Sequence, residues 1–137
     1  SEALLKCLQQ ARYCTVNDYE ARLMCDKTGR SEEVLAREVE ALVVTLGAEG
    51  SRVHWHGEVF AVPAVKADAV VDPTGCGDAY RAGLLHGIAN GWDLLRSARL
   101  AAVMGAIKIA HRGGQNHNPS RADIGLRYRE AFGEDLW

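Results

Sequence analysis

The sequence predicts an α/β layered protein, and three observations predict it. Segments with the apolar spacing of helices alternate along the chain with short β-branched segments. Residues 41–46, ALVVTL, form a continuous apolar run, which is typical of a strand buried on both faces of a parallel sheet. A glycine-rich turn at residues 75–77 stands directly before a long helical pattern. We therefore expect one domain over residues 1–137 in which helices pack on a mostly parallel sheet.

The expected elements follow in order. They are a helix over 2–10, a strand over 13–17, helices over 18–25 and 32–39, a strand over 41–46, strands over 51–55 and 58–62, and helices over 75–90, 93–111 and 121–132. Asn17 or Asp18 can cap the second helix, and Ser31 and Ser120 can cap later ones, because short polar side chains accept from the first free N–H groups. His56-Gly57 between two alternating segments predicts a hairpin.

The helix over 93–111 has a stripe of mostly small residues. The stripe consists of Leu94, Ala98, Ala101, Ala102, Gly105, Ala106 and Ile109. Small side chains on one face allow close approach, so this helix is expected to pack tightly on its neighbour or on the sheet.

Composition restricts the function classes. The chain has a net charge of −2 at pH 7, so its charge does not favour nucleic acid or an anionic membrane as a partner. Neither a transmembrane run nor a signal peptide is recognisable. The four cysteines and five histidines lack zinc-site spacing. We therefore expect a cytoplasmic protein with reduced thiols.

One stretch, VVDPTGCGDAYRAG at residues 70–83, carries recognisable chemistry. Gly75 and Gly77 precede a helix whose first N–H groups lack partners and favour an anion in front of them. Without Cβ atoms there, a phosphate can approach the backbone closely. A pure phosphate cradle does not explain Asp78, whose charge repels phosphate. An enzyme that transfers phosphate to a hydroxyl does explain it, with Asp78 as the base.

The same turn has other interpretations. Asp78 could simply complement the dipole of a capped helix, and Gly-x-Gly-Asp by itself does not decide the matter. Arg81, one turn further, could reach phosphate or form a surface ion pair. A P-loop requires G-x-x-x-x-G-K-[ST], which the chain lacks. A dinucleotide fingerprint also fails, because Tyr80 stands where its last glycine belongs.

Four segments resemble, in order, those of the PfkB (ribokinase-like) carbohydrate kinases. They are TVNDYEARLM for the N-x-x-E segment, VTLGAEG for the nucleotide-side turn, DPTGCGDAYRAG for the signature before the catalytic helix, and AAVMGAIKIAHRGGQ for the helix and loop lining the adenine site. The resemblance covers about residues 5–130 and is nearest to bacterial adenosine-kinase-like or ribokinase-like members. It implies a three-layer αβα fold of ribokinase type, of which this chain is the C-terminal portion.

The resemblance also implies roles for individual residues. Asp78 would be the catalytic base, and the N–H groups of Gly75, Cys76, Gly77 and Asp78 would form an anion hole. Asn17 and Glu20 would act on Mg²⁺ through water. The implied nucleotide-binding positions are Thr45, Gly47 and Gly50, with His111 and Asn116 as loop candidates for which solvation is the alternative. Asp72 and Thr74 match positions that in some members hold a monovalent cation such as K⁺.

The implied activity is ATP-dependent transfer of phosphate to a hydroxymethyl group of a sugar or nucleoside. Family members are longer, and their first half supplies a substrate lid and an earlier glycine-rich signature, neither of which this sequence shows. The alternative is therefore a nucleotide-binding or structural fragment without activity of its own. The residues that choose the substrate, and those that form a homodimer through the lid, are expected outside this chain.

Overall fold

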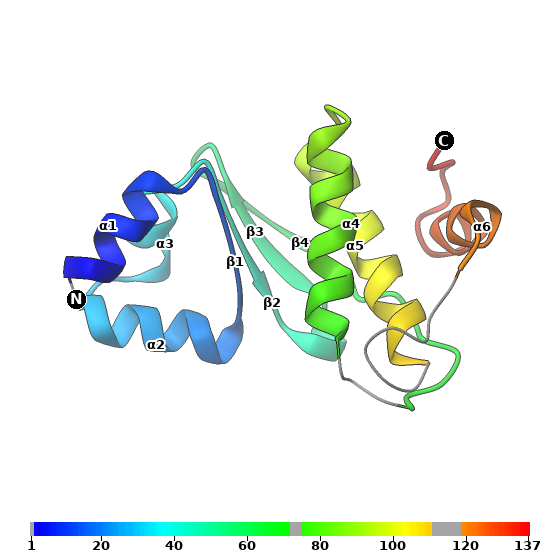
Figure 1. Ribbon diagram of the computed structural model, residues 1–137, viewed down its shortest axis with the longest axis horizontal. Helices are drawn as coiled ribbons and strands as arrows, with labels where there is room; N and C mark the ends of the chain where they lie inside the picture. Colours follow the sequence, from blue (N-terminus) through cyan, green and yellow to red (C-terminus); the bar gives the residue numbers. More distant parts are fainter. Residues whose placement is uncertain (1, 72–74, 111–118) are drawn as a thin grey trace. The chain divides into compact units, whose positions relative to one another are not determined.

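The structure, a computed structural model, describes residues 2–71, 75–110 and 119–137. The chain divides into two units, residues 1–62 and 63–137. The first contains α1 (Glu2–Gln10), β1 (Tyr13–Asn17), α2 (Asp18–Thr28), α3 (Glu32–Ala36), β2 (Ala41–Thr45), the 3₁₀ turn η1 (Gly47–Glu49), β3 (Ser51–Trp55) and β4 (Glu58–Val62). The second contains α4 (Cys76–Ala89), α5 (Leu94–Ile109) and α6 (Arg121–Phe132) (Figure 1).

The first unit is built on a four-stranded sheet in the order β1-β2-β3-β4. β1 and β2 are parallel, and β2 is buried from Ala41 to Val44, as its continuous apolar run predicts. β3 and β4 form the predicted hairpin and add two antiparallel pairings. His56 and Gly57 both have positive φ, of 50° and 79°, which matches the right-handed twist of a two-residue hairpin. The hairpin thus makes the sheet mixed, a refinement of the mostly parallel sheet expected from the sequence.

Three helices pack against one face of this sheet, on the left of the sheet in Figure 1. Leu8 of α1, Met24 of α2 and Leu35 of α3 are buried together with Leu42 and Val44 of β2. Leu42 and Val44 are two positions apart and therefore point to the same face of the strand. The core of this unit lies between that face and the helices.

α3 is shorter than the helix predicted over 32–39. Its last residue is Ala36, and the N–H groups of Arg37, Glu38 and Val39 bond to carbonyls three residues earlier, at 3.1–3.4 Å. Bonds of this spacing tighten the end of a helix. The tightened turn buries Val39 and leads the chain into β2.

The second unit contains an antiparallel pair of helices, α4 and α5, packed closely as the small-residue stripe predicts. A Cβ built at Gly83 would lie 2.9 Å from the Cα of Ala101, and one at Gly87 would lie 2.8 Å from the Cα of Ser97. Only glycine fits at such distances between helix backbones. The residues of α5 that face α4 here include Ser97, which lies outside the predicted stripe.

The C-terminal segment completes the second unit. Tyr128 of α6 and Leu136 are buried against Leu100, Val103 and Ile107 of α5. Arg96 on α5 donates to the carbonyl of Leu136.

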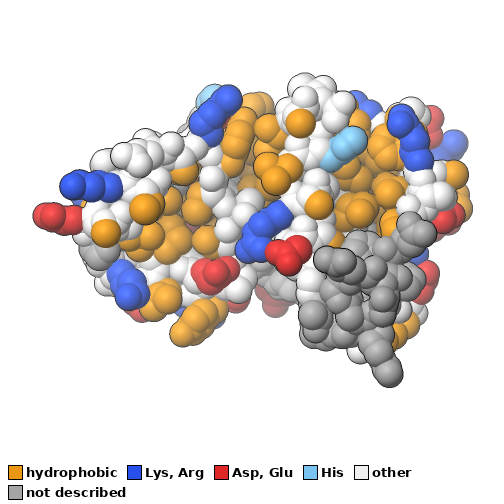
Figure 2. All heavy atoms as spheres, in the orientation of Figure 1, with side chains coloured by type: hydrophobic (Ala, Val, Ile, Leu, Met, Phe, Trp, Pro, Cys, Tyr) orange, Lys and Arg blue, Asp and Glu red, His pale blue; other side chains and the backbone are white. Residues whose placement is uncertain are grey.

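Charges are mixed on the surface drawn in Figure 2, where basic and acidic side chains are interspersed and neither gathers in one large patch. Among the helices in the described ranges, none combines the length and hydropathy needed to cross a bilayer.

Candidate functional site

The carboxyl ends of β1 and β2 bring two predicted site residues to the same level of the sheet. Asn17 is paired with Thr45, and Thr45 is paired on its other side with Ser51, the first residue of β3. Thr45 Oγ1 donates to the carbonyl of Val16 at 3.4 Å. Ligands of open α/β sheets bind beyond the carboxyl ends of the strands, so this row lies at the favoured edge.

Asn17 and Glu20 meet directly in a capping box at the start of α2. Asn17 Oδ1 accepts from the N–H of Glu20 at 2.7 Å, and Glu20 Oε1 accepts from the N–H of Asn17 at 2.9 Å. Both residues are exposed. Glu20 Oε2 has no hydrogen bond to a protein group within the described ranges, so one carboxylate oxygen is available beyond the cap.

That oxygen suits Mg²⁺ held through water better than a metal held by the protein alone. Magnesium keeps several waters and commonly binds one or two carboxylates together with substrate phosphates. Among the residues that the structure describes, no cluster of three His, Cys, Asp or Glu side chains could hold a metal ion. The donor set therefore fits a magnesium ion that arrives with phosphate oxygens.

The turn between β2 and β3 contains the predicted nucleotide-side glycines. Gly47 has φ of 61° and Gly50 has φ of 95°, which are left-handed values that favour glycine. The turn is closed by bonds from Leu46 N to Gly50 O at 2.8 Å, from Glu49 N to Leu46 O at 3.2 Å, and from Gly50 N to Gly47 O at 3.1 Å. A Cβ on Gly47 would meet nothing within 4 Å, so conformation and not crowding requires glycine there.

The second unit contains the glycine turn at the start of α4. Gly75 is the N-cap residue, with φ of 79°, and it offers no side-chain cap to the first turn. Its carbonyl accepts from Ala79 N at 2.9 Å, which starts the helix. Gly75 therefore does not supply the N-cap side-chain acceptor that Asn17, Ser31, Asp93 or Ser120 provides elsewhere. This arrangement favours an anion in front of the helix.

Asp78 lies at the third position of α4, and its side chain is 88% exposed. Arg81 Nη1 lies 3.3 Å from Asp78 Oδ1, so Arg81 forms the ion pair that was one of its two expected roles. The same guanidinium nitrogen would lie 3.5 Å from a Cβ on Gly77. A carboxylate and a guanidinium thus lie at the first turn of α4. The carboxylate can accept a proton, and the guanidinium can balance charge.

Asp72 and Thr74, and the loop candidates His111 and Asn116, lie outside the described residues. The structure therefore brings together Asn17, Glu20 and Thr45 in the first unit, with the turn at 47–50 following directly, and Gly75 to Asp78 in the second.

The sequence did not reveal one cluster, formed by Glu32, Arg52 and His54. Arg52 makes two bonds to the Glu32 carboxylate, Nε to Oε2 at 2.6 Å and Nη2 to Oε1 at 2.7 Å. His54 Nε2 lies 2.5 Å from Glu32 Oε2. The hydrogen bond from Arg52 lowers the pKa of Glu32, against the opposing effect of burial, and the bond from His54 lowers it further. Alternation in SRVHW places residues 52 and 54 on one face, but no local pattern identifies Glu32 as their partner.

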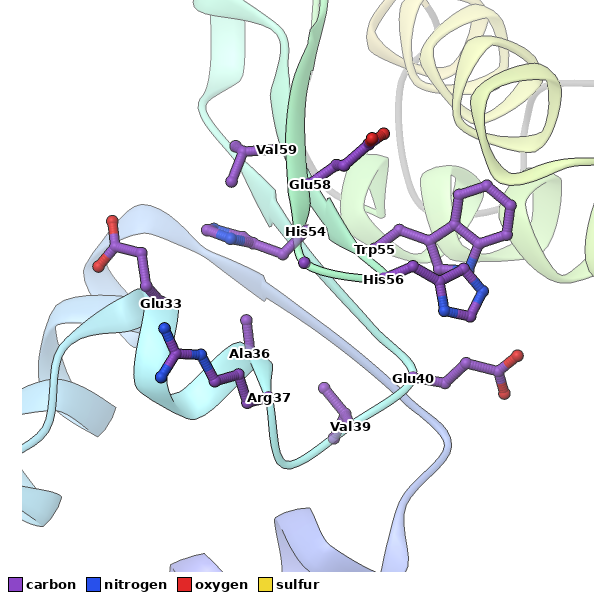
Figure 3. A pocket seen from close by; sticks show the side chains of 11 residues that line it. Glu33, Ala36, Arg37, Val39, Glu40, His54, Trp55, His56, Glu58 and Val59 are labelled. Atoms are coloured by element: carbon purple, nitrogen blue, oxygen red, sulfur yellow. The ribbon is translucent and has the colours of Figure 1, made fainter.

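A groove of about 440 Å³ borders this cluster. It lies between the end of α3 with the following chain and the β3–β4 turn (Figure 3). His54 reaches it, and the rings of Trp55 and His56 lie 4.6 Å apart beside it. None of the predicted site residues within the described ranges lines this groove.

Comparison with known proteins identifies the class. The profile of the pfkB family of carbohydrate kinases matches residues 1–121, most of the chain. The fold is therefore α/β of the ribokinase type, as expected, and the chain belongs to the pfkB family of carbohydrate kinases.

Particular relatives agree with that family. The nucleoside kinase of Methanocaldococcus jannaschii is 29% identical over 87% of this chain and 39% of its own length. The ribokinase of Lactococcus lactis is 31% identical over 86% of this chain and 39% of its own length. The structure of Burkholderia thailandensis nucleoside kinase in complex with inosine is 48% identical with a TM-score of 0.95, over 98% of this chain and 44% of that one. The chain thus spans about two fifths of the length of these relatives.

Proposed function

We propose that this chain supplies the phosphoryl-transfer machinery of an ATP-dependent kinase that acts on a hydroxymethyl group of a nucleoside or sugar. The observation that carries the proposal is the first turn of α4, where the N-cap residue Gly75 has no side chain and Asp78 presents an exposed carboxylate at the third position. Membership of the pfkB family supports the reaction type. Two nucleoside kinases among the similar proteins, one of them solved with inosine, favour a nucleoside as the acceptor.

In the proposed reaction, Asp78 takes the proton from the acceptor hydroxyl. The hydroxyl oxygen forms a bond to the γ-phosphorus as the bond from that phosphorus to the ADP oxygen breaks. The N–H groups at Gly75, Cys76, Gly77 and Asp78 balance charge on the transferred group. Arg81, paired with Asp78 in this structure, supplies positive charge at the same turn.

The first unit would hold the nucleotide and its metal. Thr45, Gly47 and Gly50 would lie along ATP, while Asn17 and Glu20 would bind the waters of Mg²⁺, which neutralises phosphate charge. The further assignments also stay proposals: nucleotide contacts for His111 and Asn116, a K⁺ site at Asp72 and Thr74, a homodimer and a cytoplasmic location.

The test is phosphoryl transfer from MgATP to adenosine, inosine and ribose by the intact protein and by an Asp78→Asn variant. Loss of a general base should lower turnover by on the order of 10²–10⁴-fold. Asp123→Asn is the matched control, because Asp123 occupies the same third position of α6. The control should retain wild-type turnover, and near-normal turnover of Asp78→Asn would remove Asp78 from the mechanism.

A second candidate is a nucleotide-binding module that does not transfer phosphate by itself. It is favoured by the share of the relatives that the chain covers, 39% of each of two kinases. Calorimetric titration of the 137-residue chain with MgATP, beside the transfer assay, separates the two. Binding without transfer supports the module, and transfer by these residues alone excludes it.

A further inference from the structure

We infer that the cluster of Glu32, Arg52 and His54 is a positioning device for the turn at residues 47–50. The inference rests on the proposed function, in which that turn lies along ATP. None of the three residues is among the candidates for contact with nucleotide, metal or acceptor. Their effect would be transmitted through β3, which begins directly after the turn.

The cluster has the geometry of a clamp. Both Nε and Nη2 of Arg52 bond to the carboxylate of Glu32, and His54 bonds to the same carboxylate. A two-pronged pair of this kind fixes orientation as well as distance. Two alternate residues of β3 are thereby tied to one residue at the start of α3.

The carboxylate end of the clamp is more buried than an ordinary surface pair. The side chain of Glu32 is 18% exposed and that of His54 is 6% exposed, while that of Arg52 is 38% exposed. Exposed ion pairs contribute little because water screens them; here Glu32 and His54 are shielded, and the partly exposed Arg52 adds orientation through its two bonds to the carboxylate. Ser31 also anchors α3, since its Oγ accepts from the N–H of Val34 at 3.3 Å, so the carboxylate is presented from a capped helix.

The clamp acts on the chain directly after the turn. Arg52 is two residues beyond Gly50, and Ser51 between them is paired with Thr45 of β2. The turn itself is closed by the three backbone bonds described above. The turn is preceded by the buried strand β2 and followed by Arg52, which is bonded to Glu32. Both ends of the turn are therefore fixed, and its N–H groups are ordered before a nucleotide binds. Such preorganisation improves affinity because less conformational entropy is lost on binding.

The same unit offers a matched control at the other end of the sheet. Arg12 Nε lies 3.0 Å from Glu40 Oε2. Arg12 precedes β1 and Glu40 precedes β2, so this pair lies at the amino ends of the two parallel strands, away from the turn. Like Arg52 and Glu32, Arg12 and Glu40 are an arginine–carboxylate pair that joins segments far apart in sequence.

The experiment measures MgATP affinity by calorimetry for the 137-residue chain and for Arg52→Gln, Arg52→Lys and Arg12→Gln. Amide hydrogen exchange at Glu49 and Gly50 reports the order of the turn in the same samples. Arg52→Gln should weaken MgATP binding, because turn residues that lose their order must be ordered again on binding. Each such residue should cost about tenfold in affinity. Amide exchange at the turn should also become faster. Arg52→Lys keeps the positive charge but cannot make both bonds to the Glu32 carboxylate. Its affinity for MgATP should therefore lie between those of Arg52→Gln and wild type. Arg12→Gln should bind as wild type does.

Two outcomes would overturn the inference, and they are distinguishable. If the wild-type chain binds MgATP and both Arg52 variants bind with unchanged affinity, the clamp serves stability alone, whatever happens to the melting temperature. Arg52→Lys decides this point if Arg52→Gln does not fold. If the wild-type chain itself binds no MgATP, the proposed nucleotide function fails, and this inference fails with it.

Discussion

Asn17 and Glu20 cap each other across the first turn of α2, each side chain accepting from the other's backbone N–H at 2.7 and 2.9 Å. The two residues proposed to serve magnesium therefore also begin a helix. A substitution at either position can disturb both roles, so the choice of replacement decides what an experiment measures.

Glu20→Gln separates the two roles. Glutamine can replace glutamate in a capping box, so the melting temperature should stay near that of wild type. The lost charge should weaken the apparent affinity for Mg²⁺ in the presence of ATP by on the order of tenfold. Asn17→Ala removes the cap and should lower the free energy of unfolding by about 0.5–2 kcal/mol. Unchanged magnesium dependence of nucleotide binding in Glu20→Gln would leave Glu20 with the capping role alone.

Gly87→Ala should strongly destabilise the second unit. The added Cβ would lie 2.6 Å from the Cβ and 2.8 Å from the Cα of Ser97, and backbone at that distance has to move. Overpacking of this kind costs about 1–3 kcal/mol, measurable by urea unfolding. Gly105→Ala is the control, because a Cβ there meets nothing within 4 Å, and it should stabilise α5 by about 0.5–1 kcal/mol. Equal stability of the two variants would contradict the close approach of α4 and α5.

Glu32 should make stability depend on pH in acid. Hydrogen bonding from Arg52 lowers the pKa of Glu32 below its ordinary value of 4.5. A carboxyl group whose pKa falls on folding stabilises the protein above its ordinary pKa, and that contribution is lost as the pH falls through the folded-state pKa. Glu32→Gln should therefore be less stable than wild type at pH 7, with a difference that narrows below pH 4.5. Urea unfolding between pH 7 and pH 3 tests this, with Glu40→Gln as the control, and a constant difference would show that the charge is not the cause.

Tyr128 should ionise at an unusually high pH. Burial, aided by a hydrogen bond to Glu134, raises the pKa of Tyr128 to about 12. Absorbance titration should therefore show a phenol ionisation step at about pH 12, and Tyr128→Phe should remove that step. Because the unfolded chain ionises near pH 10, this residue's contribution to stability should be lost as pH rises from about 10 to 12. A late step that persists in Tyr128→Phe would assign it to another tyrosine.

Local patterns predicted much of the fold. Asn17, Ser31 and Ser120 cap the helices that were expected to follow them, because an N-cap needs only a short polar side chain before a helical segment. β2 and the hairpin were likewise recognisable, one from its apolar run and the other from His56-Gly57. The end of α3 was predicted three residues too late, because the tight turn that buries Val39 depends on the sheet beneath it.

The candidate site divides in the same way. Asp78 and its glycines could be proposed from the sequence because an anion site at a helix start needs residues adjacent in sequence. The sequence left two roles open for Arg81, contact with phosphate or a surface ion pair. The structure shows the ion pair, with Asp78.

The sequence by itself therefore determined the elements, their caps, the glycine turn and the family, since all of these depend on residue types at short and regular spacings. Only the tertiary structure decided which distant groups meet. Glu32 joins Arg52 across 20 residues, and Gly87 lies against Ser97. The physical reason is that such contacts arise from strand register and helix packing, which depend on the whole chain and leave no periodic trace in it.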